Sequence, residues 1–120
     1  MQMLDVLIIG AGPSGSICST LLHTANINVL VVEKQIFPRF SIGESLLPQS
    51  MSFLENAGMI QAVDDGCFQH KNGAVFKYKK QHSEFNFEEK FSPGPGTTYQ
   101  VKRADFDKRL ADFAESKGVS

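Results

Sequence analysis

Three glycines, Gly10, Gly12 and Gly15, have the spacing of a loop that binds the pyrophosphate of a dinucleotide. They follow an apolar run at residues 6–9, which predicts a strand, and precede residues 16–23, which predict a helix. In this setting the first glycine permits a tight turn, the second lets a phosphate approach the backbone, and the third lets the helix pack closely on the strand. Free N–H groups and the helix dipole then favour an anion. We therefore place the phosphates at Gly10, Gly12, Pro13, Ser14 and Gly15.

An acidic residue stands where a ribose-binding carboxylate is expected. Glu33 ends a second apolar run, residues 29–32, and comes 18 residues after Gly15. At the carboxyl end of a strand it can accept both hydroxyl protons of an adenosine ribose, which favours FAD or NAD over NADP. The alternative is a glycine turn that only links a strand to a helix, but such a turn does not need three glycines at this spacing. Lys34, the next residue, is included in the predicted cofactor site.

The composition predicts one ordinary globular unit, because 42% of the 120 residues are hydrophobic and 21% are charged. A formal net charge of −1 provides no basic field, so we expect neither nucleic acid nor an anionic membrane as a partner. The first apolar run is short and carries Asp5, which argues against a secretory signal or membrane span and favours the cytoplasm. Cys18 and Cys67 are predicted to be free thiols, and no metal site is predicted.

The chain after Glu33 departs from the alternating strands and helices of a plain NAD domain. Residues 37–47 predict a loop. A helix is expected from Pro48 to about Ala57, followed by a short helical turn at residues 59–63. The second strand therefore leads into irregular and helical structure rather than into a third parallel strand.

A predicted hairpin distinguishes FAD from NAD. Residues 73–80 and 84–91 each alternate apolar and polar side chains, and the polar connection Gln81-His82-Ser83 suits an antiparallel turn. A hairpin in this place predicts a second, sheet-based domain laid over the cofactor, as in flavoproteins of the hydroxylase type. FAD is therefore favoured.

After a Pro-Gly loop, residues 98–102 predict a short strand, and residues 104–117 predict an amphipathic helix that returns to the nucleotide domain. Arg103, at the start of this helix, is either within reach of a cofactor phosphate or ribose, or simply exposed. Asp107, one turn later, could hold the guanidinium or cap the helix. Because the chain stops where a further strand would begin, we expect it to be the leading part of a longer enzyme.

Three stretches together resemble the flavin-dependent halogenases and their relatives in the superfamily of FAD-containing monooxygenases and geranylgeranyl reductases. They are residues 5–15, the segment Phe37-Pro-Arg-Phe-Ser-Ile-Gly-Glu-Ser-Leu-Leu-Pro48, and Val101-Lys-Arg103 with Phe106, Asp107 and Leu110. The resemblance covers nearly the whole chain. It implies an α/β fold, in which a Rossmann-like FAD-binding βαβ domain is followed by the start of an inserted antiparallel β substrate domain.

The same resemblance implies further cofactor contacts. Residues 37–48, called the strap from here on, are similar to a halogenase segment that runs past the flavin, and Arg103 is similar to an arginine that contacts the cofactor. The contacts implied within the strap are Arg39, Ile42, Gly43, Glu44, Ser45 and Leu46. We divide the chain into residues 1–70, the first part of the FAD-binding domain, 71–97, the start of the substrate-domain hairpin, and 98–120, the strand and helix that return to the FAD-binding domain.

Lys71 matches the position of the active-site lysine of halogenases. The mechanism that this implies has reduced FAD, O2 and halide yield hypohalous acid, which the lysine hydrogen-bonds or converts to a haloamine beside an electron-rich ring. Such a lysine needs a desolvated amine in a dry pocket. The alternative is that Lys71 is one more solvated lysine beside Lys77, Lys79 and Lys80.

The predicted function is an FAD-dependent oxidoreductase of the halogenase-like branch, acting on a small molecule with a separate flavin reductase as the implied electron source. Two other enzymatic functions stay open, a flavin monooxygenase that hydroxylates and a reductase of the geranylgeranyl-reductase type. A non-catalytic nucleotide-binding module is the alternative if the native chain ends at Ser120. The Trp-x-Trp-x-Ile-Pro segment that separates halogenases from ordinary flavin monooxygenases does not occur in these 120 residues, which contain no Trp.

Overall fold

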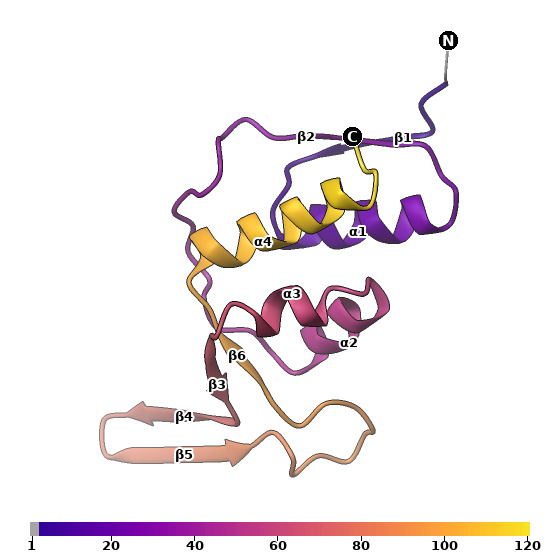
Figure 1. Cartoon of the computed structure of the whole chain (residues 1–120). Coiled ribbons are helices and arrows are strands. Elements are labelled where there is room, and N and C mark those ends of the chain that lie inside the picture. The colour runs from indigo at the N-terminus through magenta and orange to yellow at the C-terminus, as the bar shows by residue number, and fades with distance from the viewer. Residues whose placement is uncertain (1–2) are drawn as a thin grey trace.

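The fold begins with a parallel strand–helix–strand unit. The computed structural model describes residues 3–120, and Figure 1 shows the arrangement of its elements. Strands β1 (Val6–Ile9) and β2 (Val29–Val32) pair in parallel, and helix α1 (Pro13–Thr24) connects them. The predicted α/β unit is confirmed. The helix begins at Pro13 rather than Ser16, because a proline in the first helical turn has a favourable φ and lacks an N–H that would have no helical partner there.

Four helices enclose the core. Helices α1 and α4 (Arg103–Ser116) lie side by side along β1 and β2, and α2 (Gln49–Asn56) and α3 (Ile60–Asp64) pack on their other side (Figure 1). The predicted bounds of the last three helices are confirmed to within one residue at each end. The largest fully buried apolar side chains lie between these helices and are Leu54, Met59, Val63, Leu110 and Phe106.

A small antiparallel sheet joins the helices to the far end of the molecule. Strand β3 (Gln69–Lys71) pairs with β6 (Thr98–Gln100), with Lys71 opposite Thr98. Strand β3 was not predicted, because three polar residues carry no alternating apolar pattern. Strand β6 ends at Gln100 rather than Lys102, since the next two residues lead into α4.

The predicted hairpin is present, but its turn lies elsewhere. Strands β4 (Gly73–Tyr78) and β5 (Gln81–Asn86) pair with Tyr78 opposite Gln81, so the turn is Lys79-Lys80. The predicted turn at residues 81–83 is wrong, because those residues belong to β5. A two-residue turn needs a residue with positive φ, and Lys79 supplies it with φ of 53°. Strand β5 also ends before Phe91, which was predicted to lie in it.

The last residue of the chain lies beside β2. The Val31 N–H donates a 2.7 Å hydrogen bond to the Ser120 carbonyl. The turn before it has Gly118 at φ of +102°, a conformation that favours glycine. None of the helices within residues 3–120 is long and apolar enough to cross a membrane.

Because of a hydrogen bond between Tyr99 and Asp64, we expect the folded protein to lose stability at alkaline pH. The bond is 2.6 Å long, and together with burial it raises the pKa of Tyr99 from 10.0 to about 12. A raised folded-state pKa gives stability that is present in full below pH 10 and is lost as the pH approaches 12. We expect Tyr99→Phe to remove the tyrosine that ionises near pH 12 in an absorbance titration, and to lessen the loss of stability between pH 10 and 12. If the tyrosine that the substitution removes instead ionises near pH 10, this bond does not form.

Candidate cofactor site

The glycine turn between β1 and α1 has the backbone geometry that was expected of it. Gly10 has φ of +104°, and a Cβ atom on Gly15 would lie 1.9 Å from the Gly10 carbonyl oxygen. The first glycine is therefore needed for conformation and the third for space. A Cβ on Gly12 would lie 3.6 Å from Nη2 of Arg39, so this guanidinium stands directly beside the turn.

Glu33 lies against the same turn. One carboxylate oxygen accepts a 2.9 Å hydrogen bond from the Ala11 N–H and the other accepts a 3.0 Å bond from the Gln35 N–H. These bonds lower the pKa of Glu33, so the carboxylate stays ionised at neutral pH. Each oxygen keeps a lone pair that can accept another hydrogen bond. The adjoining Lys34 is exposed.

A buried carboxylate holds the two predicted arginines together. Asp107 has no exposed side-chain surface, and its Oδ2 accepts a hydrogen bond of 2.5 Å from Nη1 of Arg39. Arg103 donates to the same carboxylate through Nε at 2.7 Å and Nη2 at 3.0 Å. This hydrogen bonding raises the pKa of Arg103, which stays charged. Of the two roles predicted for Asp107, it takes the guanidinium-holding one, and it does so for two arginines.

Arg103 also anchors the strap. Its Nη1 donates to the carbonyl oxygens of Ile42 at 2.8 Å and Gly43 at 3.2 Å. Most of its N–H groups are thus engaged within the protein, whereas Arg39 faces the glycine turn. Sequence reasoning missed the bond between Arg39 and Asp107, because these residues are 68 positions apart and no local pattern links them.

The rest of the strap lies along β6. Residues 42–45 are exposed and Leu46 is half-buried. Gly43 has φ of +95°, which favours glycine. Lys71 is close by, because its Nζ donates to Oγ of Ser45 and, at 3.1 Å, to the Leu46 carbonyl. The structure therefore brings the predicted catalytic lysine to the predicted flavin-contacting segment, and it places the glycine turn, Glu33 and Arg39 together as a second group.

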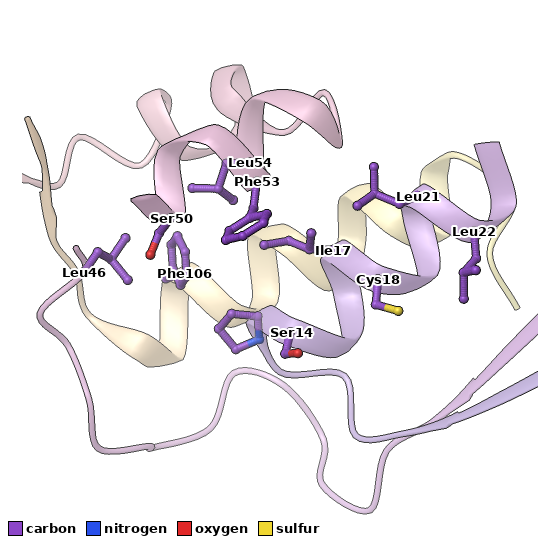
Figure 2. A pocket seen from close by; sticks show the side chains of 11 residues that line it. Ser14, Ile17, Cys18, Leu21, Leu22, Leu46, Ser50, Phe53, Leu54 and Phe106 are labelled. Atoms are coloured by element: carbon purple, nitrogen blue, oxygen red, sulfur yellow. The ribbon is translucent and has the colours of Figure 1, made fainter. Parts of the chain in front are cut away.

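An apolar cavity lies next to the predicted cofactor residues. Figure 2 shows side chains from α1, α2 and α4 that converge on it, with Ile17, Phe53 and Phe106 pointing toward one another. Its volume is about 560 Å³, and predicted cofactor residues Pro13, Ser14 and Leu46 form part of its wall. The other wall residues were not predicted to be part of the cofactor site and are Ile17, Cys18, Leu21, Leu22, Ser50, Phe53, Leu54 and Phe106. The cavity thus connects the glycine turn to the strap.

Comparison with known families decides which cofactor this site takes. The sequence profile of one family, described as the FAD binding domain, matches residues 3–120. The chain belongs to this family. FAD is therefore its cofactor, as predicted, and NAD is no longer an alternative.

The relatives of this FAD-binding chain include halogenases. The 1H-pyrrole-2-carbonyl-[peptidyl-carrier protein] brominase of Pseudoalteromonas luteoviolacea (strain 2ta16) is 38% identical over 115 residues, which are 96% of this chain and 27% of the brominase. The structure of CmlS, a flavin-dependent halogenase, matches with a TM-score of 0.89 and 36% identity, over 100% of this chain and 22% of CmlS. A flavoprotein/dehydrogenase from Cytophaga hutchinsonii matches with a TM-score of 0.93 and 49% identity, over 99% of this chain and 29% of that protein. The predicted resemblance to halogenases is confirmed, and the chain spans about a quarter of the length of these relatives.

The observed geometry fits FAD. Within residues 3–120 no side chain caps the first turn of α1, so the N–H groups of Ser14 and Gly15 are available to phosphate oxygens. Arg39 adds a positive charge beside the same turn, and the Glu33 carboxylate beside it has free lone pairs of the kind that ribose hydroxyls need. The roles of the individual residues, including Lys34 and Arg103, stay predictions.

We expect Glu33→Ala to weaken FAD binding by about 1 to 3 kcal/mol, the cost of leaving buried hydroxyl donors without an acceptor. The measurement is the dissociation constant of FAD by flavin fluorescence at neutral pH. Glu55→Ala is the matched control, because Glu55 is an exposed carboxylate on α2, away from the glycine turn. Equal affinities of the two variants would remove Glu33 from the FAD site.

Proposed function

We propose that this chain is part of an FAD-dependent halogenase, which uses reduced FAD, O2 and halide to halogenate an electron-rich small molecule. The observation that carries the proposal is the position of Lys71, whose amine lies against Ser45 and Leu46 of the strap. The halogenase relatives support it, since they match nearly the whole chain. The domain division at residues 70 and 97 is part of the proposal, although strand β3 crosses the first boundary.

When bound, FAD in its anionic reduced form (FADH⁻) would supply two electrons and one proton; with O2, one halide ion and two further protons, the overall products would be hypohalous acid, water and oxidised FAD. The neutral amine of Lys71 then takes the halogen from hypohalous acid: an N–halogen bond forms, the O–halogen bond breaks, and water leaves. Transfer to an electron-rich ring forms a carbon–halogen bond and returns the ring proton to the amine. In the alternative form of this step, Lys71 donates a hydrogen bond to hypohalous acid and orients it.

The surroundings of the Lys71 amine suit this role. The ring of Phe87 is buried and its centroid lies 5.2 Å from Nζ, so one side of the amine faces an apolar surface. On the other side the strap provides two oxygen acceptors. Together they limit where the amine can point, as is required for a group that must meet both hypohalous acid and a substrate ring.

The direct test supplies the intact protein with reduced FAD, O2 and chloride or bromide, and an indole, phenol or pyrrole probe. A halogenated product in the mass spectrum, absent when halide or FAD is omitted, is the expected result. Consumption of reduced FAD without a halogenated product from any probe counts against the proposal.

A second candidate function is an FAD oxidoreductase that hydroxylates or reduces its substrate. The observation that favours it is the flavoprotein/dehydrogenase from Cytophaga hutchinsonii, which is more similar to this chain than CmlS is. Rapid oxidation of NADH or NADPH by the purified protein alone, with no dependence on halide, would support this function.

We further propose a cytoplasmic location and a separate flavin reductase as electron donor. The reductase rests on the resemblance to halogenases, and the location rests on the first apolar run, which is short and carries Asp5. Its test is reconstitution: turnover should require an added NADH-dependent flavin reductase and should stop when that reductase is removed.

A further inference from the structure

The strap pairs with the edge of the small sheet through an isolated antiparallel bridge to β6. The Val101 N–H donates to the Glu44 carbonyl at 2.8 Å and the Leu46 N–H donates to the Tyr99 carbonyl at 3.1 Å, with Ser45 opposite Gln100. On its other edge β6 pairs with β3, which carries Lys71. Strand β6 therefore lies between the strap and the lysine, and it sets the distance between them.

Within this arrangement the Lys71 side chain crosses β6 to reach the strap. Its Nζ meets two acceptors there, Oγ of Ser45 and the Leu46 carbonyl at 3.1 Å. The carbonyl is a fixed part of the sheet, since Leu46 is itself hydrogen-bonded to β6. The Ser45 hydroxyl is the only side-chain group among residues 3–120 that accepts a hydrogen bond from this amine.

We infer that Ser45 is a positioning residue for Lys71: its hydroxyl holds the lysine amine against the strap. This inference rests on the proposed function. A lysine side chain has a flexible four-carbon stem that ends in a compact charge. A single carbonyl acceptor therefore leaves the amine free to take several other positions. A second acceptor restricts those positions. The resemblance assigned Ser45 to the cofactor, and the contact with Lys71 is a separate role.

Substitution of Ser45 can isolate that role. The backbone bonds that join the strap to β6 belong to Glu44 and Leu46, so Ser45→Ala removes the hydroxyl and leaves the pairing of the strands. Ser45→Thr keeps a hydroxyl and is the rescue variant. Ser41→Ala is the matched control, because Ser41 lies in the same strap and its hydroxyl contacts only the Ile42 carbonyl.

Two measurements are made on the intact protein saturated with FAD. The first is the rate at which an amine-reactive acylating reagent modifies Lys71, read by peptide mass spectrometry without halide or substrate. The second is the coupling ratio, the halogenated product formed per reduced FAD consumed. Loss of a hydrogen bond to a charged group predicts that Ser45→Ala raises the labelling rate several-fold and lowers the coupling ratio by about tenfold. Ser45→Thr should restore both.

The outcomes separate this inference from the proposed function. Unchanged labelling of Lys71 in Ser45→Ala overturns the inference, whatever the activity. Faster labelling with an unchanged coupling ratio overturns the role of Ser45 in halogen transfer. If the wild-type protein forms no halogenated product, the proposed function fails, while the labelling rates still decide whether Ser45 holds the amine.

Discussion

Lys71→Met is expected to lower the rate of halogenated product formation by about 10² to 10⁴-fold, the range for loss of a positioned side chain that takes part in the chemistry. Methionine is chosen because its length and apolar character preserve packing on the Phe87 ring, which lies 5.2 Å from Nζ in the native protein. The substitution removes the amine and its hydrogen bonds to the strap. Reduced FAD should still be oxidised by O2, but without formation of halogenated product.

The matched control is Lys77→Met. Lys77 is an exposed lysine on the adjoining strand β4, opposite His82, and it has no contact with the strap. This variant should keep the wild-type rate. Product formation and oxidation of FAD are followed in the same reaction. A Lys71→Met enzyme that halogenates as well as Lys77→Met would show that Lys71 is not catalytic.

Asp107→Ala should be the most destabilising single substitution at the cofactor site. Asp107 is fully buried, and the side chains of Arg39 and Arg103, which it holds, are only 13% and 15% exposed. Removing the carboxylate leaves two positive charges close together in a poorly solvated place. Removing one partner of a buried ion pair lowers the free energy of unfolding by about 3 to 5 kcal/mol. The measurement is the free energy of unfolding in urea.

A neighbouring carboxylate on the same helix provides the comparison. Asp105 pairs with Arg109 at 3.0 Å on the surface of α4, and both side chains are substantially exposed. Asp105→Ala should therefore lower the free energy of unfolding by less than about 1 kcal/mol. Asp107→Ala should also weaken FAD binding, because Arg39 loses the bond that orients it beside the glycine turn. Equal stability losses in the two variants would show that Asp107 is not a buried anchor.

The parts of the fold that were predicted correctly depend on short-range patterns. The strand, glycine turn and helix at the start follow from an apolar run, three glycines and a helix-compatible run, all within residues 6–24. The helix bounds near Pro48 and Arg103 follow from apolar spacing and from the proline at the start of the first of these helices. Glu33 could be predicted because a strand's carboxyl end places the next residue at the same edge as the turn.

The hairpin shows the limit of such patterns. Its strands alternate as expected, but alternation within each strand does not determine which residues of the two strands pair, so it does not determine where the chain reverses. The observed register places Ala74 opposite Phe85 and stacks Phe76 on Phe85 at 5.9 Å. These contacts between the strands stabilise the register in which the chain turns at Lys79-Lys80 rather than at residues 81–83.

The sequence by itself thus determined the βαβ unit, the glycine turn, the place of the Glu33 carboxylate beside it and the helices, since each follows from short-range patterns in the chain. Only the tertiary structure decided that Asp107 holds both arginines, that the strap pairs with β6, and that Lys71 meets Ser45. The partners in these contacts are separated by up to 68 residues. A pairing over such a distance follows from how whole elements pack, and the residue types at either end do not specify it.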